Sequence, residues 1–115
     1  MSDIFTAAAE RLSRVGGVLG ALIVEKDSAV PVVAELSEGV NGTAVAALAA
    51  SLFRRTGQAS DAAQFGRLST LQLEADDGHV IVVDAGELIL VVITARDAQL
   101  GLVRLEAHRA AESLA

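Results

Sequence analysis

The sequence predicts an α+β domain in which three helices cover the two faces of a five-stranded antiparallel sheet. Helical and strand-like hydrophobic periodicities follow one another along the 115 residues in the order α-β-β-α-β-β-β-α. A chain of this length can build one hydrophobic core but not two. We therefore expect residues 1–115 to form a single domain.

The first helix and the first two strands are apolar segments separated by turn residues. Apolar residues recur at helical spacing over residues 4–15, and Gly16 and Gly17 end this pattern. Residues 18–24 form a continuous apolar run, which is typical of a strand buried on both faces. Residues 30–34 predict a second strand, which must lie at a sheet edge because Pro31 has no amide hydrogen to donate.

Residues 43–56 predict the middle helix, which we expect Gly57 to end. The stripe expected to face the sheet is apolar: Val45, Leu48, Ala49, Leu52 and Phe53. The opposite face carries small residues and one arginine: Thr43, Ala47, Ala50 and Arg54.

Three strands and a helix complete the predicted fold. Residues 67–75 alternate between apolar and polar side chains, so this strand is half exposed and suits the second edge. Asp76-Asp77-Gly78 predicts a hairpin turn, and the apolar runs 80–83 and 88–94 predict buried central strands. After a cap at Asp97, the last helix presents one apolar stripe: Leu100, Val103, Ala107, Ala110 and Leu114.

Composition excludes several classes of protein. Hydrophobic residues make up 52% of the chain, but the longest apolar run is about eight residues, whereas a membrane-spanning helix needs roughly 20. The net charge is −6, with no basic cluster larger than Arg54-Arg55, which excludes nucleic-acid binding. The absence of cysteine excludes disulfides, thiol nucleophiles and cysteine-bound zinc. We expect a cytoplasmic protein without a cofactor, whose excess apolar surface is buried against a partner.

Four segments carry a resemblance to a known family: VGGVLGALIV at 15–24, the alanine-rich stretch 44–52, LQLE followed by GHVIV within 71–82, and LGLVR at 100–104. Through these segments, which are spread along nearly the whole chain, the sequence resembles the Roadblock/dynein light chain family. It is most similar to bacterial single-domain members that regulate gliding-polarity GTPases. The resemblance implies the profilin-like Roadblock fold with strand order 2-1-5-4-3. That order places the strand with Pro31 and the strand at 67–75 at the two edges.

The resemblance also implies a homodimer, formed by antiparallel packing of the middle helices and by pairing of the third strands. We expect the dimer interface to contain these residues: Thr43, Ala47, Ala50, Ser51, Arg54, Leu71 and Leu73. Alanine is also the best helix former, so the Ala47/Ala50 face has a simpler explanation. We favour close helix approach because the excess apolar surface must be covered.

Candidate catalytic and metal-binding residues have ordinary structural explanations. His79 and His108 lack metal-ligand spacing, so we expect two surface histidines and no metal site. Asp76-Asp77 fits a turn better than a cation site. Arg54 and Arg55 could contact a partner and stabilise a transferring phosphate in trans, although the helix dipole alone favours arginine near a helix C-terminus.

Three functions remain open. The first is a non-enzymatic homodimer that binds a small Ras-like GTPase and modulates its nucleotide cycle or localisation, by positioning the groups of the GTPase itself. The second is a structural adaptor, such as a light-chain-like clamp or a sensor-kinase partner, with no dependence on nucleotide. The third, an enzyme or small-molecule sensor, would need a polar pocket, for which the apolar strands offer too few polar residues.

Overall fold

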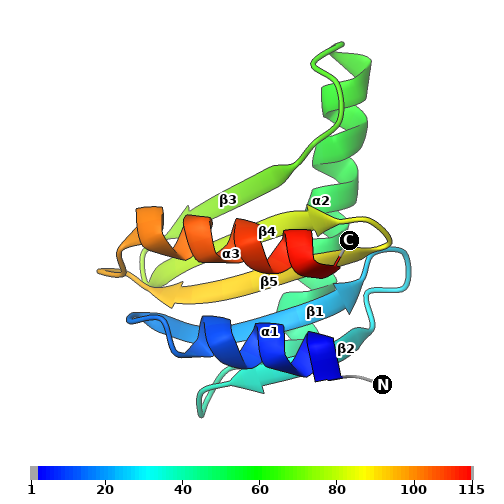
Figure 1. Cartoon of the computed structure of the whole chain (residues 1–115). Coiled ribbons are helices and arrows are strands. Elements are labelled where there is room, and N and C mark those ends of the chain that lie inside the picture. The colour runs from blue at the N-terminus through cyan, green and yellow to red at the C-terminus, as the bar shows by residue number, and fades with distance from the viewer. Residues whose placement is uncertain (1–2, 115) are drawn as a thin grey trace.

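The computed structural model describes residues 3–114, in which helices and strands follow one another in the predicted order (Figure 1). Their bounds are α1 (Asp3–Ser13), β1 (Val18–Glu25), β2 (Pro31–Leu36), α2 (Gly42–Ala62), β3 (Thr70–Ala75), β4 (Gly78–Ala85), β5 (Leu88–Ala95) and α3 (Leu100–Leu114).

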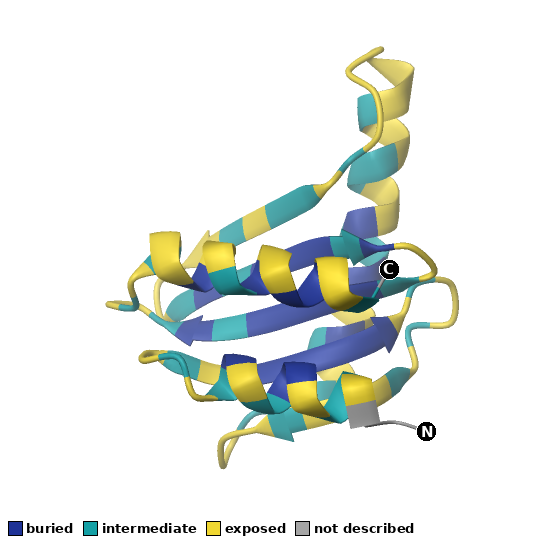
Figure 2. Cartoon of the chain, viewed as in Figure 1, coloured by how far each residue is buried: buried dark blue, intermediate teal, exposed yellow. Residues whose placement is uncertain are grey.

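The strands form one antiparallel sheet in the order β2-β1-β5-β4-β3, which confirms the prediction. The strand that begins with Pro31 lies at one edge, and β3 lies at the other. The three central strands carry the longest apolar runs in the sequence. Their middle parts are buried on both faces because helices cover the sheet from both sides (Figure 2), whereas residues near the ends, such as Val80 and Ile93, are only partly buried.

Two separate hydrophobic clusters hold the helices on the sheet. α1 and α3 pack side by side on one face, over residues such as Ile23, Ile81 and Val92. α2 alone packs on the other face, over Leu22 and Val91. The sheet is therefore covered by two helices on one side and by a single helix on the other.

α2 continues past Gly57 to Ala62, so the predicted helix end was wrong. A glycine inside a helix costs only about 1 kcal/mol relative to alanine, which the hydrogen bonds of the following residues offset. The helix ends instead in a Schellman motif. In this motif the Phe65 amide donates to the Ser60 carbonyl at 2.9 Å and the Gln64 amide donates to the Asp61 carbonyl at 3.0 Å. The sequence hid this end because Gln64, not glycine, adopts the left-handed conformation, with φ of 63°.

Two further boundaries and one histidine differ from the expectation. β3 begins at Thr70 rather than at residue 67. α3 begins at Leu100, so Asp97 lies in the preceding turn and not at the cap. His79 is buried, not on the surface: its Nδ1 lies 3.4 Å from the Thr94 hydroxyl on the neighbouring strand β5.

The β3–β4 turn should tolerate no side chain at Gly78. A Cβ atom there would lie 2.1 Å from the backbone carbonyl oxygen of Thr94 on β5, which cannot move without breaking the sheet. Gly78→Ala should lower the free energy of unfolding by about 1–3 kcal/mol, measured by urea denaturation. The matched control is Gly16→Ala, where the Cβ position has open space. Equal unfolding midpoints for the two variants would contradict this account of the turn.

Candidate self-association surface

α2 contacts the sheet through its small residues. Ala46, Ala49 and Ala50 are buried, together with Phe53. Alanine side chains let the helix axis approach the sheet closely, so the larger leucines of α2 lie at its sides. Ala50 therefore belongs to the core of the single chain, and its predicted place on the opposite face was wrong. Leu48, which was expected in the core, is 47% exposed.

One flank of α2 is apolar and partly exposed. It consists of Val45, Leu48, Leu52 and Ala59, at spacings of three, four and seven residues that keep them on one side of the helix. Val45 and Leu52 are half-buried, while Leu48 and Ala59 are exposed. We call these four residues the apolar flank of α2.

The other flank of α2 carries most of the sequence-predicted interface. Thr43, Ala47 and Arg54 are exposed there and Ser51 is half-buried. Arg54 lies beside Lys26 and Asp84, where a small pocket of about 220 Å³ opens between α2 and the ends of the central strands. The structure thus brings four predicted interface residues together on the polar flank and away from the apolar one.

An apolar hollow of about 270 Å³ lies in the sheet near the β3–β4 turn. Its apolar lining includes Leu19, Leu73, Val80 and Ile93. Leu73, Val80 and Ile93 are neighbours across three adjacent strands. Val80 and Ile93 pack against the α2 cluster but are only partly buried. α2 runs obliquely from Leu36 on β2 to the opposite end of this face, near Lys26 and Asp84, so the helix leaves the hollow open.

The β3 edge completes this surface. β3 pairs with β4 on one side, and no strand within residues 3–114 pairs with its other side. Leu71 and Leu73 are half-buried and point to the α2 face, where Leu71 packs against the α2 cluster. An edge with unpaired backbone groups and apolar neighbours is a template for pairing with another strand.

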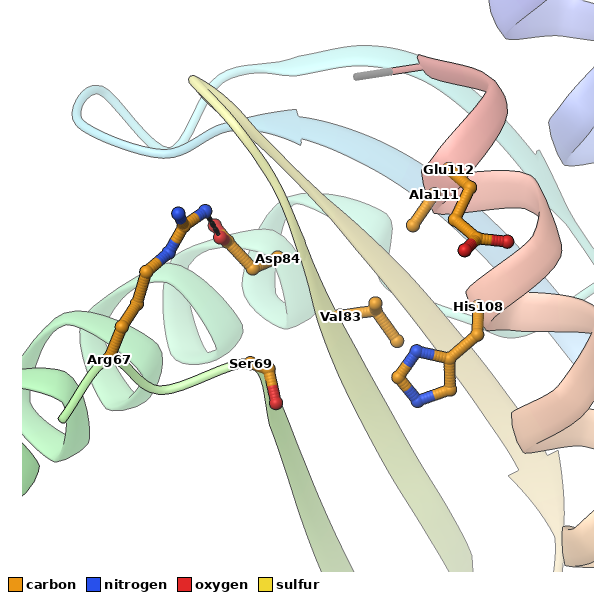
Figure 3. A pocket seen from close by; sticks show the side chains of 7 residues that line it. All are labelled: Arg67, Ser69, Val83, Asp84, His108, Ala111 and Glu112. Atoms are coloured by element: carbon orange, nitrogen blue, oxygen red, sulfur yellow. Dashed lines mark hydrogen bonds and ion pairs between the residues drawn. The ribbon is translucent and has the colours of Figure 1, made fainter. Parts of the chain in front are cut away.

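A buried ion-pair cluster fixes the segment that connects α2 to β3. Asp84, at the end of β4, has a side chain only 6% exposed, and its carboxylate accepts hydrogen bonds from Lys26 and Arg67. Lys26 also lies over the Phe53 ring, 5.6 Å from its centre. Arg67 reaches Asp84 from the α2–β3 connection, as Figure 3 shows. The cluster therefore ties the β1–β2 turn and the α2–β3 connection to β4.

Desolvation by burial would raise the pKa of the Asp84 carboxyl. The hydrogen bonds and positive charges of Lys26 and Arg67 outweigh burial and hold this pKa below its usual value. Asp84 is thus an ionised structural residue. It also borders a pocket of about 370 Å³ where His108 and Glu112 of α3 lie opposite Arg67 (Figure 3).

The remaining candidate residues are placed as follows. His108 is exposed, and its Nε2 lies 3.2 Å from the Thr70 hydroxyl. Arg55 is exposed on α2, next to Arg54. Among residues 3–114, no group of three or more histidine, aspartate or glutamate side chains could hold a metal ion. Over the same range, no helix is long and apolar enough to cross a membrane.

Sequence reasoning missed the apolar flank of α2 and the hollow. The leucine spacing predicts a core stripe because large apolar residues usually face inward, and it does not distinguish a buried stripe from an exposed flank. The hollow had no local signal, because its residues come from four strands that only the register brings together.

Comparison with known proteins identifies the family. The model of the Roadblock/LC7 domain matches residues 5–94. Two uncharacterized proteins of Methanocaldococcus jannaschii, MJ1340 and MJ0714, are 34% and 35% identical over 103 residues, which is 90% of this chain and 90% and 86% of those proteins.

Solved structures confirm the Roadblock fold. Myxococcus xanthus MglB superposes with a TM-score of 0.88 at 22% identity, covering 99% of this chain and 93% of that one. A Roadblock/LC7 domain from Streptomyces avermitilis gives 0.84 at 21% identity, covering 94% and 92%. A third structure, described as MglB with a tetrameric arrangement, gives 0.82 at 24% identity, covering 94% and 82%.

The ion-pair cluster should stabilise the fold in a pH-dependent way. At neutral pH, Asp84→Asn should lower the free energy of unfolding by about 1–3 kcal/mol, because Lys26 and Arg67 lose a charged acceptor. A carboxyl with a depressed folded-state pKa stabilises the fold above its unfolded pKa, and this contribution is lost as pH falls through the folded-state pKa. The difference between Asp84→Asn and the unmodified chain should therefore shrink below about pH 4.

Urea unfolding across this pH range measures the effect. The matched control is Asp77→Asn, which removes an exposed turn carboxylate and should change stability little. If Asp84→Asn and Asp77→Asn had the same effect at neutral pH, the cluster would have no structural role.

Proposed function

The chain belongs to the Roadblock/LC7 domain family, and on that premise we propose that it is a cytoplasmic homodimeric module that binds a small Ras-like GTPase. In this proposal the module has no catalytic activity of its own and modulates the nucleotide cycle or the localisation of the GTPase. Family membership and the likeness to MglB support a regulatory or scaffolding role.

The apolar flank of α2 is the observation that carries the self-association part of the proposal. Leu48 is exposed and Leu52 is half-buried, on the side of α2 opposite Arg54, and the same face of the sheet has an open hollow near the β3–β4 turn. Apolar surface of this kind, continuous from a helix to an open strand edge, is typical of a surface that binds protein. The tetrameric arrangement of one MglB structure supports self-association in the family.

The dimer that we propose joins two β3 edges and packs two α2 helices antiparallel. Antiparallel pairing of β3 with its copy places both α2 helices on the same face of one continuous sheet. Each helix then has its apolar flank toward the other. Leu71 and Leu73 remain part of this interface, whereas Thr43, Ala47, Ser51 and Arg54 lie at its rim.

The GTPase part of the proposal rests on the family. A dimer of this kind offers a rigid, two-fold symmetric surface on which switch segments of a GTPase could be held in one conformation. Arg54 and Arg55 are exposed and could contact the partner. In this proposal they bind and orient the GTPase rather than enter its catalytic site.

A structural adaptor is the second candidate. It would use the same dimer to hold a peptide or a domain of another protein, such as a sensor kinase, regardless of nucleotide. The chain could also pair with a paralogue in place of a second copy, since pairing along β3 and packing of the apolar flank do not require the two chains to have the same sequence.

Self-association should depend on Leu48 and not on Ala47. Light scattering during size exclusion should give about twice the chain mass of 11.8 kDa for the unmodified protein. Leu48→Glu should yield a monomer, because a buried unpaired carboxylate at the helix contact is too costly. Ala47→Glu, which places the same charge one residue away on the other flank, should remain a dimer.

Both variants should keep the circular dichroism spectrum of the unmodified chain, since Leu48 and Ala47 are exposed in the single chain. A dimer that survives Leu48→Glu and is lost in Ala47→Glu would show that the polar flank, and not the apolar flank, forms the interface. A monomeric unmodified protein at micromolar concentration would contradict self-association.

Binding to a GTPase should depend on its nucleotide. We expect the immobilised dimer to retain a Ras-like GTPase from the same genome in one nucleotide state, loaded with GDP or with a non-hydrolysable GTP analogue, and not in the other. Retention in both states would favour the adaptor, and retention in neither would contradict GTPase binding. An arginine finger contributes about 10³–10⁵ to the hydrolysis rate, so a smaller effect of Arg54→Ala and of Arg55→Ala would exclude that role.

A further inference from the structure

Phe65 is held in solvent by an ordered turn at the end of α2. Its side chain is 87% exposed, well above the 56% of Val30. In a Schellman motif an apolar residue at this position usually packs back on the helix, but here its counterpart is Ser60. The Ser60 hydroxyl donates instead to the Gly66 carbonyl at 2.7 Å. The turn therefore presents Phe65 outward and gives it no contact within the chain's own core clusters.

The backbone of this turn is itself strained. Gln64 has a φ of 63°, a left-handed conformation that costs a non-glycine residue free energy. A strained turn that exposes a large aromatic side chain is unfavourable for a protomer alone. It is explained if the aromatic side chain is buried in an assembly.

α2 is longer than the sheet is wide. Its 21 residues span about 31 Å at roughly 1.5 Å per residue, whereas five strands at about 4.8 Å spacing span about 19 Å. The helix starts over β2, where Gly42 lies against Leu36. Figure 1 shows its C-terminal part extending past β3. The part after Gly57 is exposed apart from a half-buried Ser60, and Gln58 and Asp61 border the pocket beside Asp84 at the end of β4.

The two-fold axis of the proposed dimer would bring this overhang onto the partner. Where α2 leaves the sheet, beside Asp84 on β4, it lies over the half of the face near Lys26, and the axis beside β3 exchanges the two halves. The overhang of one protomer then lies over the other half of the partner's face. That half contains the hollow near the β3–β4 turn, at Leu73, Val80 and Ile93.

We infer that Phe65 of each protomer inserts into this apolar hollow of a second copy, so that two symmetric aromatic contacts lock the dimer. The inference rests on the proposed homodimer and adds a specific anchor to it. The hollow of about 270 Å³ is open, apolar and large enough for an aromatic ring, and a phenylalanine buried there loses its water contacts. A second copy is the occupant because the overhang that carries Phe65 has the length to reach the hollow across the shared β3 edge.

Sedimentation equilibrium of Phe65→Ala tests the anchor. Loss of one buried phenylalanine should weaken association roughly tenfold or more, so the two symmetric contacts should raise the dimer dissociation constant about a hundredfold. The matched control is Val30→Ala, which truncates another exposed apolar residue in the β1–β2 turn and should leave the dissociation constant unchanged. Phe65→Leu should retain most of the affinity.

Fluorescence gives a readout that does not depend on affinity. The chain contains no tryptophan, so Phe65→Trp introduces a single emitter. Its emission should be blue-shifted in the dimer and move to longer wavelength on dilution to monomer. Wild-type affinity of Phe65→Ala together with a solvent-exposed tryptophan in the dimer would overturn the anchor and leave the homodimer intact. A chain that never dimerises would overturn both.

Discussion

Every layer of this structure depends on one constraint: the three central strands are apolar on both faces, so both faces must be kept from water. α1 and α3 meet the requirement on one face by packing side by side. On the other face α2 is the single covering helix within residues 3–114; it runs from Leu36 on β2 to Lys26 and Asp84 and leaves Val80 and Ile93 only partly buried. The part of that face left open near the β3–β4 turn is therefore a consequence of the topology and not a local defect of packing.

The residues of α2 suit this incomplete cover. Its alanines lie against the sheet and bring the helix close, which leaves Leu48 and Leu52 at its side, away from the core. The helix also continues beyond β3 into solvent, where it ends in a hydrogen-bonded turn (Figure 1). The Asp84 cluster fixes where the chain returns from this overhang to β3. A close helix contact, an apolar flank and a fixed overhang together define one surface suited to a symmetric partner.

Much of the fold could be predicted from the sequence, because it is recorded in local patterns. Solid apolar runs marked the central strands, while Pro31 and the Leu71–Gln72–Leu73 alternation marked the edges. The interface was harder to predict. Ala50, expected on the exposed face of the helix, is buried, and Leu48, expected in the core, is exposed. Periodicity identifies an apolar side of a helix but not which of its small or large residues pack against the sheet. The end of α2 and the Asp84 cluster depend on a left-handed glutamine and on contacts between distant residues, which no local pattern records.

Amide hydrogen exchange of β3 at several protein concentrations tests the central claim most directly, because it asks whether a second chain covers this edge. In the single chain, amides of residues 70–75 that face away from β4 have no strand within residues 3–114 to bond to and should exchange freely. The account predicts that these amides become protected as concentration rises, while those of the β2 edge do not change. Equal, concentration-independent exchange at both edges would contradict it.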